Sequence, residues 1–494
     1  MRSDGKLFMF GVMEVTNAEQ FQINGIPLGP DLTKNQADAI FAFGKEAVIF
    51  ALLAQAKMIA DQCSDKQAPS RSDDPSCPSA QKPPYEKPSK KGRKKKPGRK
   101  KGHEGSCRPN PEHVDRTEIH RAKCCPDCGA KLKNCTGSRD RYVEDIPEDV
   151  RVEVVRHVIH RDWCPCCRKM IEPTVPDALP RSTIGNRLLA LSAWLHFCLG
   201  TTISQVLAVF NFHLHFKMTS GGLVHMWHRL ADILESWYEE IAEDIIQSGV
   251  LYGDETGWRL DGKPGWLWCF TSRLTSLFAI ERSRASPVVL KFITDYFDGV
   301  FVSDFWGAYN VLTCVKQKCL VHLLRDLERV EKYKDTSVDW PRFAKKLKRL
   351  IRDAIRLRNR LDTLDASTYE QRYHRIEKRL QLMIETGCTN KEAQRLVKRL
   401  KRHQHDLFTF LLEHEVPFEN NFAERIIRQA VIMRKNSYCN RSDRGARTQA
   451  ILMSVFTTLK QRNLNPIKTV EKALRIYITT GKLPSLADFS ASDR

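Results

Sequence analysis

Three acidic residues in this chain have the types and positions that could bind a metal ion. Asp254 lies in the β-rich run VLYGDET, and Asp304 ends the apolar run GVFVSD. Glu424 lies in NNFAERIIRQAVIMRKNS, where Asn420 or Asn421 can cap a helix and several arginines follow. A carboxylate among arginines suits the binding of a metal ion against a phosphate backbone. Each residue alone has a plainer interpretation, as a turn residue, a helix cap or a member of a salt bridge.

The elements around the two aspartates explain how they could meet. Three short β-rich runs joined by turn residues, between residues 250 and 281, predict an antiparallel meander. A helix is expected over 285–296, followed by a buried strand that ends in Asp304. The order βββαβ places Asp254 on the first strand and Asp304 at the carboxyl end of the fourth. If these strands are neighbours, the two carboxylates come within metal-bridging distance.

Two CxxC pairs predict a structural zinc site. Cys125 and Cys128 form the first pair and Cys164 and Cys167 the second, and four thiolates close a tetrahedral Zn²⁺ site with no open position for catalysis. A strand expected over 150–159 would bring the pairs together. Unrelated buried cysteines or a redox pair are the alternatives. Further cysteines leave the register of the pairs open: Cys124, Cys135 and Cys166.

The charge of the chain indicates a polyanionic partner, and nucleic acid is the commonest one in a cell. The 494 residues include 80 Lys and Arg against 59 Asp and Glu, a net charge of +21. Ten of the basic residues fall between residues 87 and 101 without an acid, after a Ser-, Asp- and Pro-rich stretch, so we expect residues 61–110 to be flexible. Ten basic residues of the arm and of the region after Glu424 are predicted to contact DNA: Lys94, Lys95, Lys96, Arg99, Lys100, Lys101, Arg425, Arg428, Arg434 and Lys435.

Three other regions are predicted to be helical. One helix is expected over 35–62, packed on its own domain or on a second copy of the chain. In the region 183–246, Thr219 and Ser220 can cap a helix with one apolar face, which favours bundle packing over a helix-turn-helix for DNA. The third, 327–415, carries 22 basic and 14 acidic residues at helical spacing. Four of its basic residues are expected to face DNA: Lys345, Lys346, Arg349 and Arg352.

The sequence shows neither a secretory signal nor an apolar run of the ~20 residues that cross a bilayer. Sixteen cysteines without an export signal fit a reducing compartment. We therefore expect a cytoplasmic protein.

Several motifs, in order along the chain, resemble those of the insertion sequence 66 family of DDE transposases. They are DGK and GWLW after GDET, VSDFWGAYN, CLVHLLRDL, NNFAERIIR with RKNS, SDRGARTQAIL and a terminal LNP. The CxxC pairs and the arm PGRKKGHEG resemble the family's zinc-binding region. The resemblance covers roughly residues 90–480.

The resemblance implies that Asp254, Asp304 and Glu424 are the DDE triad of an RNase H-like fold, which holds two Mg²⁺ or Mn²⁺ ions. The implied reactions are 3′-end cleavage of the element and strand transfer into target DNA. Cys319 and His322 resemble a CxxH signature, which would place His322 near the scissile phosphate; a packed helix start is the alternative. The implied partners are double-stranded DNA, a second copy of the chain in a homodimer or higher oligomer, and accessory proteins of the element. The implied location is the bacterial cytoplasm, in association with the nucleoid.

The expected fold class is α/β: an RNase H-like mixed sheet with an all-α insertion, preceded by a small zinc ribbon and by N-terminal helical and disordered segments. Two other functions remain open, a zinc-containing DNA-binding repressor and an RNase H-like nuclease without strand transfer. The expected boundaries are 1–62 for a helical segment, 63–110 for the basic arm, 111–175 for the zinc ribbon, 176–249 for a helical DNA-binding or linking region, 250–326 and 416–447 for the two parts of the core, 327–415 for the insertion and 448–494 for a C-terminal helical region.

Overall fold

The structure is a computed structural model, and it describes two parts of the chain. Short segments are described near the amino terminus, at 13–15, 21–23, 26–27, 34–44, 47–49 and 51–52. Residues 111–490 are described apart from 134–136, 138, 148–149, 295, 334–338 and 438. The chain divides into two compact units, residues 1–88 and 89–494, which we treat separately. The basic arm and the boundary predicted at 63–110 lie outside the described residues.

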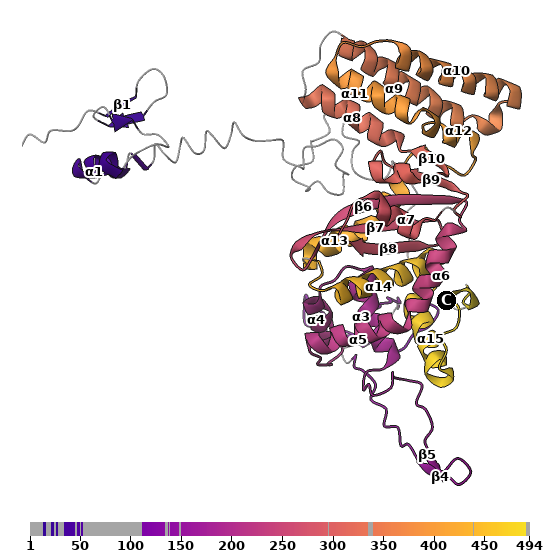
Figure 1. Ribbon diagram of the computed structural model, residues 1–494. Helices are drawn as coiled ribbons and strands as arrows, with labels where there is room; N and C mark the ends of the chain where they lie inside the picture. The colour runs from indigo at the N-terminus through magenta and orange to yellow at the C-terminus, as the bar shows by residue number, and fades with distance from the viewer. Residues whose placement is uncertain are drawn as a thin grey trace, which may run out of the picture. The chain divides into compact units, whose positions relative to one another are not determined.

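The first unit contains strands as well as helix. Its elements are β1 (Met13–Val15), β2 (Phe21–Ile23), β3 (Ile26–Pro27) and α1 (Lys34–Ala42), and the strands form an antiparallel sheet in the order β1-β2-β3 (Figure 1). The single helix predicted over 35–62 is wrong, because the chain turns at Gly44, whose φ of +98° no continuous helix allows.

The centre of the second unit is a mixed sheet of five strands. The strands are β6 (Val250–Leu260), β7 (Lys263–Thr271), β8 (Ser276–Glu281), β9 (Val300–Ser303) and β10 (Val315–Lys318). Their order is β10-β9-β6-β7-β8, in which β6, β7 and β8 are antiparallel while β9 is parallel to both β6 and β10. The predicted meander and the fourth strand are confirmed, and the fold class is mixed α/β.

Local sequence accounts for the meander. Asp261 and Gly262 join β6 to β7 as a two-residue turn with φ of 53° and 70°, which is the Asp-Gly turn that fits the twist of paired strands. The helix expected over 285–296 is shorter in the structure, where α7 spans Ser286–Phe292.

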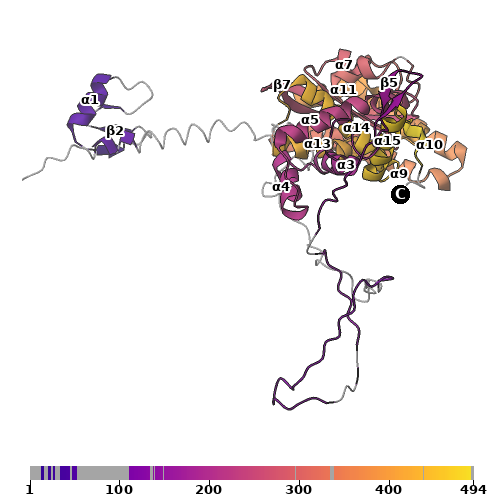
Figure 2. The same cartoon turned by 90° about the horizontal axis from the view of Figure 1, so that it is seen from below.

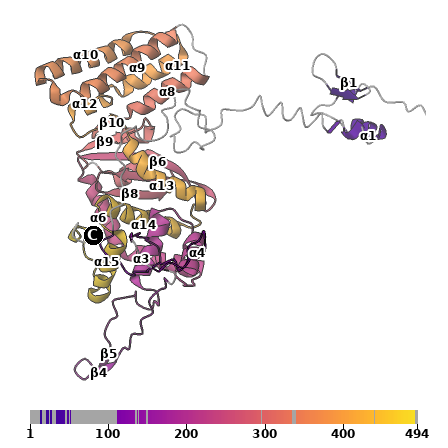
Figure 3. The same ribbon diagram turned by 180° about the vertical axis from the view of Figure 1, so that it is seen from behind.

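Helices that precede the sheet in the sequence and helices that follow it build the main core. They are α3 (Asn186–Ala193), a π-helix (Trp194–Cys198), α4 (Ile203–His213), α5 (Ser220–Ile233), α6 (Glu235–Ile246), α13 (Asn421–Ser437), α14 (Asp443–Gln461) and α15 (Pro466–Thr480). Figure 3 shows α13 and α14 beside the sheet, where α13 packs on β6 and α14 on β8. The predicted cap of α5 is confirmed, since the Thr219 hydroxyl accepts a hydrogen bond from the Gly222 amide at 3.1 Å. The apolar stripe of α5 is buried in this core, as bundle packing requires.

A helical subdomain follows β10. It consists of α8 (Leu320–Tyr333), α9 (Asp339–Arg358), α10 (Ala366–Glu385), α11 (Lys391–Arg402) and α12 (Thr409–Leu412), which lie together next to β9 and β10 in Figure 1. Its apolar faces form a second core that includes Trp340, Phe343, Leu347 and Leu350. The helices begin at residue 320, seven residues earlier than the spacing of basic residues indicated.

The region of the CxxC pairs contains one short hairpin, β4 (Asp162–Cys164) with β5 (Lys169–Ile171). The strand predicted over 150–159 is wrong, because this stretch has no regular secondary structure where it is described. Figure 2 shows the purple part of the chain before α3 as a long extended trace. Val154 is 89% exposed and therefore packs against neither a sheet nor a core, whereas Val152 is half-buried. A segment with high β propensity forms a strand only when a neighbouring strand is available, because the backbone N–H and C=O groups of a strand bond to those of its neighbour.

Candidate active site

Two neighbouring parallel strands and one helix position the three predicted carboxylates. Tyr252 of β6 pairs with Val302 of β9, so two residues further on Asp254 lies within β6 and Asp304 lies directly after the end of β9. Glu424 lies in the first turn of α13, which packs on β6. The fold thus places side by side the elements that carry three residues up to 170 positions apart in sequence.

A glycine before Asp254 allows the close packing of these strands. A Cβ atom at Gly253 would lie 2.3 Å from the ring of Phe301 on β9, so no other residue fits without displacement of that ring. The Gly253 carbonyl also accepts a hydrogen bond from the Asn420 side chain at 2.8 Å. This bond joins β6 to the residue before α13 and therefore links the strand of Asp254 to the helix of Glu424.

The pKa of Asp254 shows that the acidic groups interact electrostatically with one another. The pKa of Asp254 is raised well above its usual value, first by burial of its carboxylate and then by the negative charges of Glu255, Asp304 and Glu424. The pKa of Glu255 is raised by burial and by the charge of Asp304. Like charges held this close disfavour full ionisation, and a bound cation would relieve the repulsion.

The donor set at this site suits a hard divalent cation, because carboxylate oxygens are the ligands that Mg²⁺ prefers. Within the described parts of the chain, however, no three Asp, Glu, His or Cys side chains are close enough together to surround one ion. The residues that would hold a cation are Asp254, Asp304 and Glu424. Metal binding by them stays a prediction.

His322 and Arg325 of α8 both reach Glu424. The imidazole Nε2 lies 3.7 Å from the Glu424 Oε1 atom, and the Arg325 guanidinium lies 3.3 Å from the same oxygen. Burial lowers the pKa of His322, although Asp304 and Glu424 raise it, so the neutral ring is favoured. Its Nδ1 atom is buried without a hydrogen-bond partner. Cys319 is fully buried and accepts a hydrogen bond from the Asn420 amide at 3.2 Å, so it packs at the helix start while His322 lies beside the carboxylates.

A fourth carboxylate, Glu255, lies next to Asp254 and was missed in the sequence. Arg284 donates two hydrogen bonds to its Oε1 atom, at 3.0 and 2.6 Å, and the Tyr309 hydroxyl donates to Oε2. The Arg284 guanidinium lies over the rings of Trp266 and Trp306, 4.4 and 3.6 Å from their centroids. We call these five residues the Glu255 cluster. The signal that could have revealed it is the acidic pair in GDET, because two adjacent strand residues point to opposite faces and each needs its own partners.

The Glu255 cluster also contacts Asp304. The Trp306 amide donates to the Asp304 Oδ1 atom at 2.8 Å, and the indole of Trp306 donates to the Arg284 carbonyl at 3.1 Å. On the other side, the buried ammonium of Lys318 donates to the Ser303 hydroxyl and the Asp304 carbonyl, both at 3.0 Å. Burial lowers the pKa of Lys318 to about 8. These bonds fix the end of β9 and therefore the position of Asp304.

The basic residues predicted on α13 divide into two kinds. Arg425, Arg428 and Lys435 are exposed. Arg434 instead donates to the Thr256 hydroxyl at 3.0 Å and to the Gly257 carbonyl, so its guanidinium is held by β6. Contact with DNA stays a prediction for all four.

The two CxxC pairs each form a tight turn. The thiol pKa is lowered in Cys125 by the amides of Cys128 and Asp127, and in Cys164 by the amide and thiol of Cys167, since these groups stabilise the thiolate. In the described part of the chain the four thiols do not come together as one group. The zinc site therefore stays a prediction, and Cys135 lies outside the described residues.

Among the helices that the structure describes, none is long and apolar enough to cross a membrane.

The chain is a mixed α/β protein. Its acidic groups lie on or beside two adjacent parallel strands and on the helix α13. Residues 181–448, more than half of the chain, match the family described as "Transposase IS66 family". The chain therefore belongs to the IS66 family of transposases. It is also similar to the "Uncharacterized protein y4hP" of Sinorhizobium fredii (strain NBRC 101917 / NGR234), with 21% identity over 400 residues that cover 73% of this chain and 72% of the relative.

Proposed function

We propose that this transposase is a DDE enzyme that cleaves the 3′ ends of its element and transfers them to target DNA with Asp254, Asp304 and Glu424. The observation that carries the proposal is the position of Asp254 on β6 and of Asp304 directly after the end of β9, the strand paired with β6, with Glu424 on the helix packed against β6. The strand order β10-β9-β6-β7-β8 supports an RNase H-like core, into which the helical subdomain is inserted between β10 and α13.

The three carboxylates would hold two divalent cations, which when bound activate the attacking oxygen and stabilise the leaving oxygen of the phosphoryl transfer. The residues of this chain have separate tasks around them. Lys318 and the Trp306 amide hold Asp304, and Arg325 orients Glu424. His322, favoured in its neutral form, can accept a proton near the same oxygen. Arg425 and Arg428, exposed on the same helix, are positioned to bind phosphates.

The test uses the purified full chain, a labelled duplex that carries an element end, and Mg²⁺ or Mn²⁺. We expect 3′-end cleavage and joined products with the wild type. Asp254→Asn, Asp304→Asn and Glu424→Gln should each reduce both reactions by at least about 10³-fold, which is about 4 kcal/mol of transition-state stabilisation. Binding of the duplex should change little, because the basic surface is untouched.

Asp261→Asn is the matched control, since Asp261 lies in the turn after β6 and asparagine also accepts its left-handed backbone. This variant should cleave and join at the wild-type rate. Wild-type rates in any one triad variant would remove that residue from the site. Cleavage without joined products would favour a nuclease that hydrolyses without strand transfer.

A further inference from the structure

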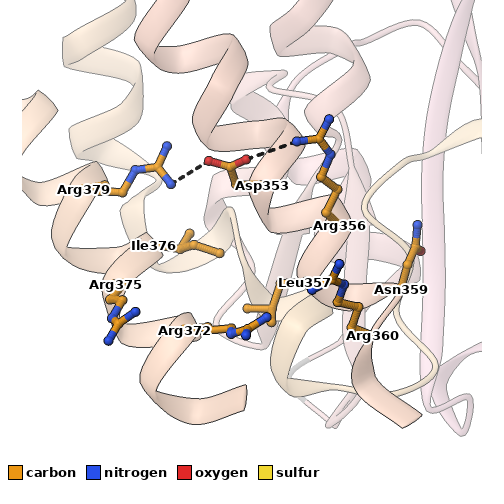
Figure 4. A pocket seen from close by; sticks show the side chains of 9 residues that line it. All are labelled: Asp353, Arg356, Leu357, Asn359, Arg360, Arg372, Arg375, Ile376 and Arg379. Atoms are coloured by element: carbon orange, nitrogen blue, oxygen red, sulfur yellow. Dashed lines mark hydrogen bonds and ion pairs between the residues drawn. The ribbon is translucent and has the colours of Figure 1, made fainter. Parts of the chain in front are cut away.

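A cavity in the helical subdomain is lined mainly by arginines. It lies between α9 and α10 and has a volume of about 630 Å³. Figure 4 shows arginines of both helices around two apolar side chains, Leu357 and Ile376, which are buried. The charged and polar lining residues are Asp353, Arg356, Asn359, Arg360, Arg372, Arg375 and Arg379.

One carboxylate cannot neutralise this group. Asp353 pairs with Arg379 at 2.8 Å and with Arg356 at 3.7 Å. Within the described residues, Arg360, Arg372 and Arg375 form no ion pair with a carboxylate, and Arg360 and Arg375 are exposed. Asp365 acts electrostatically on Arg372, but five arginines still line the cavity against the single lining carboxylate of Asp353. The cavity therefore keeps a net positive charge, which favours the binding of an anion.

The positive charge continues beyond the cavity along α9. Arg349, Arg352 and Arg356 are exposed and follow at spacings of three and four residues, so they lie on one face of the helix that ends beside Arg360. A linear row of guanidinium groups suits an extended chain of phosphates better than a single small anion. Guanidinium also binds phosphate oxygens with two parallel hydrogen bonds, which lysine cannot do.

We call this arginine-lined cavity the groove, and we propose that it binds the phosphate backbone of double-stranded DNA. The residues proposed to contact phosphates are Arg356, Arg360, Arg372, Arg375 and Arg379. The inference rests on the proposed function in one respect, that the chain acts on DNA. It assigns to the helical subdomain a binding surface separate from the carboxylate site. The contacts are to the backbone, so the groove holds DNA of any sequence.

The test compares the full chain with the triple variant Arg360→Gln, Arg372→Gln and Arg375→Gln in binding to two duplexes of equal length, one with an element end and one unrelated. We expect both affinities to fall alike. The slope of log K against log salt concentration should become shallower by about 2–3, because each lost phosphate contact accounts for ~0.9. The matching Arg→Lys triple variant should keep most of this slope, since the charge remains.

The control variant removes three exposed basic residues of α11 that do not line the groove, by Lys398→Gln, Lys401→Gln and Arg402→Gln. It should bind both duplexes with nearly wild-type affinity. Equal loss in the control would mean that only the overall charge matters, and unchanged binding in the groove variant would mean that DNA does not use the groove; either result overturns the proposal. Circular dichroism and the Tm check folding, and if the triple variant misfolds, the single variant Arg375→Gln should still lower the slope by ~0.9.

The outcomes separate this proposal from the proposed chemistry. If the wild type binds DNA through the groove but shows no cleavage that depends on Asp254, the proposed reaction fails and the groove stands. If the groove variant keeps its affinity for duplex DNA but loses affinity for single-stranded RNA, the groove belongs to another ligand and the proposal is wrong.

Discussion

Replacing Arg284 with alanine should destabilise the sheet through the Glu255 cluster. The Glu255 side chain is only 2% exposed and that of Arg284 is 31% exposed, so the change leaves a buried carboxylate without its charged partner. Removal of one partner of a buried ion pair costs about 3–5 kcal/mol. We take the lower end of this range because Arg284 is partly solvated, and add ~0.5–1 kcal/mol for lost contact with Trp266 and Trp306. The free energy of unfolding should therefore fall by about 3–4 kcal/mol.

The pH dependence of this loss identifies its cause. The pKa of Glu255 is raised by burial and by Asp304 even with Arg284 present, and it should rise further in the variant. A carboxyl group whose pKa is raised on folding lowers the free energy of unfolding at pH values above its pKa in the folded protein. It has no such effect at pH values below its ordinary pKa, which is 4.5 for Glu255. The difference between the wild type and Arg284→Ala should thus be largest near neutral pH and should narrow as the pH falls toward 4.5.

Urea unfolding followed by tryptophan fluorescence and circular dichroism, at several pH values, measures this difference. Arg282→Ala is the matched control, because Arg282 pairs with Asp443 at 3.0 Å on the surface, where the two side chains are 53% and 79% exposed. Its effect should be about 0–1 kcal/mol. Adding Glu255→Gln to Arg284→Ala should restore part of the lost stability. A loss below about 1 kcal/mol, or one that does not change with pH, would refute an ion-pair role for Arg284.

Three further predictions concern other parts of the chain. Burial lowers the pKa of His196 to about 4, so the free energy of unfolding should fall as the pH falls from 6.5 toward 4. Urea unfolding should show a smaller fall for His196→Gln over the same range, and an equal fall would exclude His196 as the cause. Freshly purified protein should contain one Zn²⁺ per chain by elemental analysis, and Cys125→Ser or Cys164→Ser should abolish it; protein without zinc would contradict the four-thiolate site. Deletion of residues 87–101 should weaken binding to all duplexes alike and make it less dependent on salt, whereas a loss limited to the element end would make the arm a reader of sequence.

Much of the carboxylate site could be predicted from local sequence. The runs around Asp254 and Asp304 have apolar patterning and turn residues that favour strands regardless of their surroundings. The cap at Thr219 likewise depends on hydrogen bonds to residues only a few positions away, and the structure confirms it. Such features depend on contacts between near neighbours in the chain, which a sequence displays directly.

Other local patterns failed where tertiary contacts decide. Asn420 or Asn421 was predicted to cap a helix, and Asn420 does lie at that position, where its carbonyl accepts a hydrogen bond from the Glu424 amide at 3.2 Å. Its side chain does not cap the helix, because the side-chain amide donates to the Gly253 carbonyl, 167 residues away, and Oδ1 is buried without a partner. The stretch 150–159 has the alternation of a strand but no neighbouring strand. A sequence shows the propensity of such residues and does not show which distant backbone groups are available to them.

By itself, then, the sequence determined the candidate residues for the chemistry, which are the acidic residues and the arginines near Glu424, and the order of the strands from β6 to β9. The tertiary structure decided that β9 pairs with β6, which sets Asp254 beside Asp304. It also decided that Arg284 and Tyr309 hold Glu255, and that arginines of α9 and α10 face one cavity. The physical reason is the same in each case. Contact between residues of different helices and strands depends on the packing of the core and on hydrogen bonds between separate segments, neither of which a local pattern contains.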